Sequence, residues 1–154
     1  FYADAGSTFV KFPDMVMESV NTTSLGVVGF QLAGHHKEIE YTKKETLDYF
    51  DFTEQMAQSD QHMASFICVR KCRSSIDHIK DYLFLCENPK LILDPEIDDI
   101  QYADFIEHRH DQSIWSLLMK TRDVTVLQDP CQWGLHHNQT TADDVFIEHH
   151  RVKT

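Results

Sequence analysis

The apolar run MASFICV at residues 63–69 indicates the fold class, because a short run of this kind between polar residues is typical of a buried β-strand. Ser74 or Ser75 can cap a helix directly after it. Apolar side chains then recur at helical spacing as far as the helix-stopping pair Asn88-Pro89: Ile76, Ile79, Leu83 and Cys86. A strand followed by a helix predicts an α/β domain with this strand near its centre.

Further strands are predicted around this pair, from short apolar or alternating runs that end at turn residues. They cover residues 1–3, 25–32, 91–93, 124–127 and 145–150. Two irregular stretches are expected between the regular elements, an acidic loop over residues 94–104 and a second loop over residues 128–134.

Two more helices are predicted from their amino-terminal signals. Thr42 and Glu45 have the spacing of a capping box, which predicts a short helix over about residues 43–50. Another helix is predicted to begin at Asp111, whose carboxylate can cap it. Its expected apolar face consists of Ile114, Trp115, Leu117 and Leu118, and the basic Lys120 and Arg122 lie near its negative end.

The composition fits one domain, since 42% of the 154 residues are hydrophobic and can form a core. The chain begins in an apparent strand end at Phe1, so we expect residues 1–154 to be a fragment of a larger domain. The formal charge of -11 would repel nucleic acid and anionic lipid, so neither is an expected partner. No run approaches the roughly 20 apolar residues that span a bilayer, and no membrane contact by this segment is expected.

The cysteines form no CxxC pair, which argues against a zinc ribbon or a thioredoxin-like motif. Buried thiols are the expectation, and disulfides stay open: Cys68, Cys72, Cys86 and Cys131. Two glycosylation sequons, at Asn21 and Asn138, favour the secretory pathway or Golgi lumen if the protein is eukaryotic.

The turn Asp4-Ala5-Gly6 follows the first predicted strand, at a sheet end where α/β proteins expose ligand-binding residues. A carboxylate there can hold Mg²⁺ or Mn²⁺ against a diphosphate, because hard cations prefer oxygen ligands. The alternative is that Asp4 is only a turn residue before the permissive Gly6.

The run EHRHDQS at residues 107–113 places two imidazoles, a guanidinium and two carboxylates at the start of a predicted helix. Arg109 and the helix amino terminus can stabilise negative charge beside Asp111, a carboxylate able to act on a sugar hydroxyl. The alternative is structural, with Asp111 as the helix cap and Arg109 paired with Glu107 or the acidic loop.

Six of the ten histidines form doublets, at residues 35–36, 136–137 and 149–150. Neighbours in a strand point to opposite faces, so each doublet can offer at most one ligand to one site. A dedicated zinc site is not indicated, although one histidine near the carboxyl terminus could complete a divalent-metal shell. A metal- or pH-responsive interaction module remains an alternative use of these residues.

Four segments, taken together and in order, resemble a family of GT-A-type glycosyltransferase-like proteins. They are residues 2–6, residues 40–43, Gln61 with residues 63–65, and residues 108–114, of which the run RHDQS at 109–113 is the most specific. The resemblance covers most of residues 1–128. It implies an α/β fold with a mixed sheet flanked by helices, of the nucleotide-diphospho-sugar transferase type, whose amino-terminal part is missing.

The resemblance also implies roles for individual residues. Asp4 and Gly6 would be a variant of the DxD motif that binds the Mn²⁺ or Mg²⁺ ion and the nucleotide-sugar donor, and Asp111 would act near the reacting hydroxyl as base or orienting group. The implied substrate-binding residues are Glu40, Thr42, Lys43, Gln61, Arg109, His110 and Gln112.

The expected function is therefore metal-dependent transfer of a sugar from a nucleotide-sugar donor to a glycan or protein hydroxyl. A catalytically silent domain of the same fold, which binds carbohydrate or a protein partner, is the alternative. The single carboxylate of the Asp4–Gly6 turn is compatible with that alternative.

Overall fold

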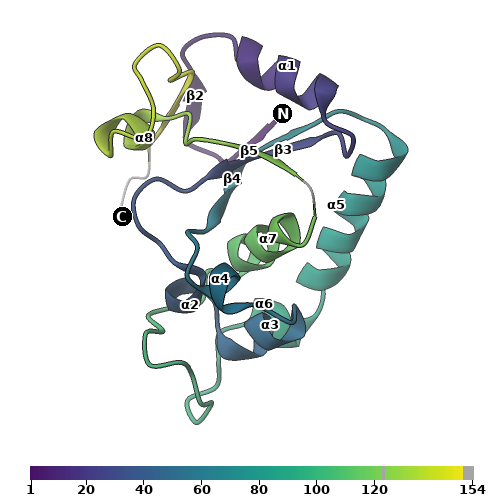
Figure 1. Cartoon of the computed structure of the whole chain (residues 1–154), viewed down its shortest axis with the longest axis vertical. Coiled ribbons are helices and arrows are strands. Elements are labelled where there is room, and N and C mark those ends of the chain that lie inside the picture. The colour runs from purple at the N-terminus through teal and green to yellow at the C-terminus, as the bar shows by residue number, and fades with distance from the viewer. Residues whose placement is uncertain (123, 151–154) are drawn as a thin grey trace.

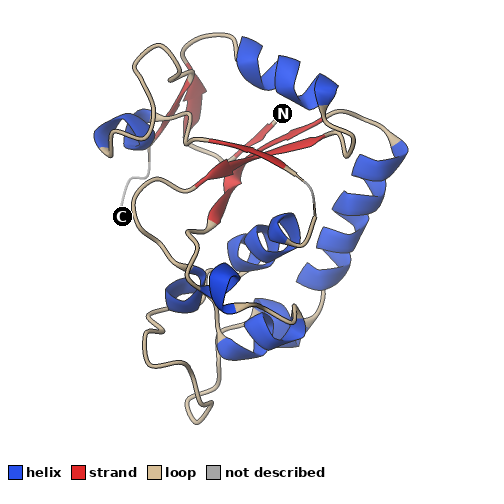
Figure 2. Ribbon diagram, in the orientation of Figure 1, coloured by secondary structure: helices blue, strands red, loops and turns tan. Residues whose placement is uncertain are grey.

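The computed structural model describes residues 1–122 and 124–150, and it is built around a four-stranded mixed sheet (Figures 1 and 2). The strand order is β1-β4-β3-β5, from β1 (Tyr2–Ala3), β4 (His62–Val69), β3 (Val27–Gln31) and β5 (Thr125–Leu127). β4 pairs antiparallel with both β1 and β3, and β3 pairs parallel with β5. The predicted α/β class and the mixed sheet are confirmed.

β4 is the central long strand because its side chains are buried on both faces of the sheet. Phe66 and Cys68 belong to one core cluster, and Ala64 and Ile67 belong to the other. The pairing of β4 with β3 contains a register shift, since Val28 lies opposite Cys68 but Phe30 lies opposite Met63. Such a bulge bends the strand and re-aims its side chains, here where β4 reaches a cavity.

Helices cover both faces of the sheet (Figure 1). α1 (Asp14–Thr22) packs Val16 and Val20 against one face. On the other face, α7 (Asp111–Lys120) buries Trp115 and Met119, with α5 (Arg73–Cys86) packed beside it. The two predicted helices are confirmed, but both predicted caps are wrong: Cys72 rather than Ser74 or Ser75 is the cap residue of α5, and His110 rather than Asp111 is the cap residue of α7.

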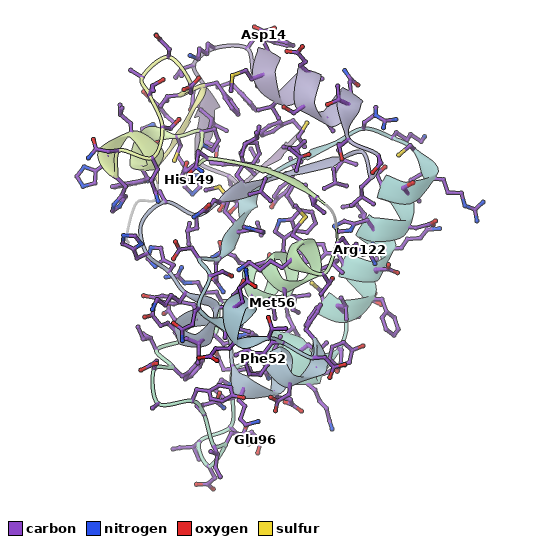
Figure 3. All side chains as sticks on the ribbon, viewed as in Figure 1. Asp14, Phe52, Met56, Glu96, Arg122 and His149 are labelled. Atoms are coloured by element: carbon purple, nitrogen blue, oxygen red, sulfur yellow. The ribbon has the colours of Figure 1, made fainter. Side chains whose placement is uncertain are left out.

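The remaining elements are short and lie at the two ends of the sheet. One group lies near α7: α2 (Glu38–Tyr41), α3 (Lys44–Tyr49), α4 (Glu54–Ala57) and α6 (Pro89–Ile92). In this group α3 and α6 contact α7, and α4 contacts α2. The other group is a two-stranded sheet of β2 (Ser7–Phe9) and β6 (Ile147–His149), with α8 (Gln132–His136) beside β6. Figure 3 shows the loop that carries Glu96, at the tip of the predicted acidic stretch, projecting from the body.

Three further local predictions are wrong. Residues 91–93 do not form a strand, because the Asn88 side chain caps a helical turn with Pro89 in its first turn. The predicted loop at residues 128–134 contains the start of α8. Thr42 does not cap α3, because its hydroxyl donates to the Glu38 carboxylate and Lys43 takes the cap position.

The cysteines and sequons are placed as follows. Among the described residues the four thiols are free, with Cys68 and Cys131 buried and Cys72 and Cys86 partly buried. Asn21 and Asn138 are exposed. In the described part of the chain, no helix combines the length and the apolar character that crossing a bilayer requires. The expectation that the chain belongs to a larger domain stays a prediction.

A buried ion pair between Glu38 and Lys120 connects α2 with α7 and with the segment just before β4. The Glu38 carboxylate, fully buried, accepts from Lys120 Nζ at 2.7 Å and from three other side chains: Thr42, Gln61 and Ser116. Lys120 Nζ also donates to the Asp60 carbonyl at 2.7 Å. Burial lowers the pKa of Lys120, while the Glu38 charge opposes that shift. The pair is well satisfied, so removing one partner leaves an uncompensated buried charge.

We expect Lys120→Met to lower the free energy of unfolding by about 3 kcal/mol, since the buried Glu38 carboxylate loses its counter-charge. The matched control is Lys44→Met, which removes an exposed partner of Asp48 and should change stability far less. Urea denaturation followed by circular dichroism measures both. Equal effects of the two substitutions would contradict a structural role for the buried pair.

Candidate functional site

A cavity of about 810 Å³ lies where β1, β4, the segment before α7 and the 129–137 region meet. Asp4 and Asp111, far apart in the sequence, both line it. Seven further titratable side chains from outside the predicted set also line it: His36, Glu107, His108, Asp129, Cys131, His137 and His149. A second cavity of about 490 Å³, between α1 and the 138–146 segment, contains none of the predicted residues.

Asp4 is held at the cavity by the backbone of its turn. Its N–H donates to the Ser65 carbonyl of β4 at 3.0 Å, and its carbonyl accepts from Ser7 N at 3.2 Å. Gly6 has a φ of +85°, and a Cβ there would lie 2.8 Å from the His150 carbonyl oxygen, so the turn requires glycine. The strand end and the glycine together fix where the Asp4 carboxylate points.

The Tyr2 hydroxyl donates to Asp4 Oδ1 at 2.7 Å. This hydrogen bond is the largest cause of a raised Tyr2 pKa, followed by burial and by the charges of Asp4 and Asp111. Asp4 and Asp111, the two acids that the sequence singled out, both line this cavity.

Asp111 is the first residue of α7, and a strained residue precedes it. His110 has φ 51° and ψ -117°, a conformation that costs a non-glycine residue about 1–3 kcal/mol. Its ring Nδ1 is 2.9 Å from the Ile92 carbonyl, which helps to hold it. The Tyr82 hydroxyl donates to the Asp111 carbonyl at 3.3 Å and lies 3.4 Å from Oδ2. The sharp turn and the tyrosine set the direction of the exposed Asp111 side chain.

Arg109 and Gln112 line the same cavity and are held by aromatic and polar neighbours. The Arg109 guanidinium lies 3.7 Å from the centre of the Tyr41 ring, and its Nε donates to Glu107 at 3.1 Å. Gln112 Nε2 donates to Gln61 Oε1 at 3.0 Å. The predicted pairing of Arg109 with Glu107 is thus present, without removing Arg109 from the cavity wall.

The other four predicted substrate-binding residues lie behind the wall: Glu40, Thr42, Lys43 and Gln61, none of which lines this cavity. Thr42 and Gln61 are fully buried and bonded to Glu38, and Lys43 is 3% exposed. Glu40 accepts from the Lys37 backbone at 3.3 Å. Their observed contacts are structural, and direct contact with a substrate stays a prediction.

Each histidine doublet contributes one residue to the cavity, as the limit of one ligand per doublet allows: His36, His137 and His149. His149 is 7% exposed, contacts Phe66 edge to face and lies with Nδ1 2.9 Å from the Ser7 hydroxyl. Trp133, Asp129 and Cys131 also line the cavity and were not predicted. The sequence indicated only an irregular loop over residues 128–134, from its turn residues.

The protein ligands available for a metal ion are few. Within residues 1–122 and 124–150, no group of three or more His, Cys, Asp or Glu side chains is placed to hold a metal ion. Mg²⁺ commonly binds through one or two carboxylates together with substrate phosphates and waters. The Asp4 carboxylate therefore fits an ion that arrives with a diphosphate better than an ion held by protein ligands alone.

His108 forms part of the cavity wall and is a neutral, bonded histidine. It is 4% exposed, its Nδ1 accepts from Lys43 N at 3.3 Å, and its Nε2 lies 2.8 Å from the Leu91 carbonyl. Burial lowers its pKa to about 4, against the opposing bond to Leu91. Protonation would place a hydrogen on Nδ1, facing the Lys43 N–H, so acid should disrupt this wall.

We expect acid to destabilise the fold through His108. Its pKa is about 4 when folded and about 6.5 when unfolded, so its contribution is complete above pH 6.5 and is lost as the pH falls toward 4. His108→Gln should reduce the pH slope of the unfolding free energy by up to about 1.4 kcal/mol per pH unit. Chemical denaturation at several pH values measures the slope.

The matched control is His35→Gln, which makes the same substitution at a side chain that is 91% exposed. A His108→Gln slope equal to that of the unaltered chain would show that His108 is not the buried neutral group described above.

A scan against protein-family models, a search of curated proteins and a search of solved structures each returned no match for this chain. The functional proposal therefore depends on the cavity, its residues and their chemistry.

Proposed function

We propose that the chain carries out metal-dependent glycosyl transfer from a nucleotide-sugar donor to a hydroxyl of a glycan or protein, on a GT-A-like fold. The supporting observation is that Asp4 and Asp111 line one cavity of about 810 Å³. That volume suits a drug-sized or sugar-sized ligand. One carboxylate follows a strand end and the other begins a helix, so both are fixed by regular structure.

The donor side of the proposed site is the turn of Asp4 and Gly6. Gly6 does not line the cavity, because the space beside its Cα is filled by the His150 carbonyl, so it would contribute through the turn that positions Asp4. A divalent cation bound with the donor would offset the negative charge of the leaving diphosphate. The protein's own contribution is the Asp4 carboxylate, held in place by Ser65 and Tyr2.

The acceptor side is the amino terminus of α7. Asp111 would accept a hydrogen bond from the attacking hydroxyl and take its proton, and Tyr82 would orient the carboxylate. Gln112 is held by the buried Gln61 and presents a polar side chain beside Asp111. In this arrangement Gln61, Thr42 and Lys43 support the site from behind the cavity wall, and their direct contact with the substrate stays a prediction.

We expect UDP with Mn²⁺ to raise the melting temperature by about 5–10 °C at a hundredfold excess over its Kd, because a ligand that binds the native state stabilises it. Asp4→Asn should abolish this rise, since it removes the carboxylate charge that would hold the cation. Asp77→Asn, an exposed carboxylate on α5, is the control. Failure of UDP and Mn²⁺ to stabilise the chain would contradict donor binding.

We expect Asp111→Asn to keep the UDP and Mn²⁺ shift but to lower UDP release from a panel of UDP-sugars by about 100-fold, as the loss of a general base does. A steady-state assay of free UDP, with the same panel of acceptors for both proteins, measures it. UDP release that is unchanged in Asp111→Asn would remove Asp111 from the reaction.

A second candidate is a carbohydrate-binding domain of the same fold without catalysis. Trp133 favours it, because this indole lines the cavity and is 49% exposed, and such a surface can pack against the apolar face of a sugar. The lack of a three-ligand metal group among the described residues is also compatible with it.

The carbohydrate-binding candidate predicts that neutral oligosaccharides alone raise the melting temperature and that nucleotides do not. Trp133→Ala should then reduce oligosaccharide affinity by roughly tenfold, through the lost aromatic surface. Tyr49→Ala removes an exposed aromatic that does not line the cavity and is the control. Oligosaccharide binding that survives Trp133→Ala unchanged would count against this candidate.

A further inference from the structure

We propose that Arg109, His36 and His137 form an anion-binding site in the wall of the cavity, suited to a carboxylate or phosphate group of a bound substrate. The site itself stands on the contacts of these side chains. Its part in selecting a donor or an acceptor rests on the proposed glycosyl transfer.

The guanidinium of Arg109 is held so that only part of its hydrogen-bonding edge is used. The Tyr41 ring lies against its face, with the ring centre at 3.7 Å, and Nε donates a hydrogen bond to the Glu107 carboxylate. One terminal nitrogen lies 3.5 Å from His36 Nδ1. The side chain is 23% exposed and lines the cavity. A planar guanidinium fixed by stacking can still donate from its terminal nitrogens to a two-oxygen anion.

His36 supplies a second donor beside Arg109. A guanidinium can only donate, so Nδ1 of His36 accepts and the ring proton lies on Nε2. Burial, and then the charge of Arg109, lowers the pKa of His36, against the charges of Asp60 and Glu40. The ring is therefore a neutral donor at neutral pH, through a nitrogen that points away from Arg109.

His137 is brought to the same place by the backbone at Gly34. A Cβ at Gly34 would lie 3.4 Å from His36 Nε2 and 3.5 Å from His137 Nε2, so the two nitrogens face one small space. The Gln139 side chain accepts from Gly34 N at 2.9 Å and holds the His137 segment there. The His36 donor thus has beside it the His137 ring, which can donate from Nε2 in one of its two tautomers, and both rings line the cavity with Arg109 in a protein whose formal charge is -11.

The chemistry common to the expected ligands is a compact anion with two or more oxygens. One source is the diphosphate of a nucleotide-sugar donor, and the other is an acidic sugar in the acceptor. Both would be recognised by a fork of N–H donors, and neutral sugars would not.

The test follows the imidazole C–H resonances of the whole chain by NMR, without metal, during titration with inorganic pyrophosphate, glucuronate or glucose. Signals are assigned from His36→Asn and His137→Asn. We expect saturable shifts at His36 and His137 with at least one anion and none with glucose. Arg109→Gln should weaken binding by roughly tenfold or more, as loss of a charge-assisted hydrogen bond does, while Arg73→Gln, at a side chain that is 95% exposed, should not.

Pyrophosphate alone as the ligand would assign the site to the donor, and glucuronate alone would assign it to an acidic acceptor. No shift with either anion, or equal shifts with glucose, would overturn the proposal, as would full binding in Arg109→Gln. Repeating the titration in Asp4→Asn separates the two hypotheses. Anion binding there, without stabilisation of the unaltered chain by UDP and Mn²⁺, would keep the anion site and reject the proposed transfer.

Discussion

The buried carboxylate of Glu38 is the constraint on which the packing of α2, α7 and the start of β4 depends. An ionised group without solvent access is costly unless it is paired and hydrogen-bonded, and here one lysine and three neutral side chains donate to it. The donors come from α7, from Gln61 just before β4 and from Thr42 just after α2. The hydrogen bonds to one carboxylate therefore fix these three elements relative to one another.

The network around Glu38 also fixes the first turn of α7, which forms part of the cavity wall. Gln61 donates to Glu38 and accepts from Gln112, which links the buried network directly to the first turn of α7. The strained His110 then turns the chain so that Asp111 starts the helix at the cavity. The strain persists because the packed surroundings of α7 over-determine its path.

The cavity wall has two chemically different parts, which supports the proposed substrate with both phosphate and hydroxyl groups. Asp4 and Asp111 offer carboxylates near Tyr2, and Arg109 with His36 offers hydrogen-bond donors near Tyr41. In each part an aromatic ring holds the charged group in place. A polar ligand entering this cavity would meet groups that are already oriented, which limits the entropy lost on binding.

Local sequence patterns were enough to predict the central strand at residues 63–69, the helices α5 and α7 and the edge strand near residue 147, because alternation, helical spacing and capping are short-range properties. They also identified Asp4 and Asp111 as cavity residues. The family resemblance assigned Thr42 and Gln61 to substrate binding, which stays a prediction, but it did not indicate that both side chains bond to the buried Glu38. Local patterns also missed His36 and His137, which meet only through the fold. Burial and pairing across the chain are long-range, and only the tertiary structure decides them.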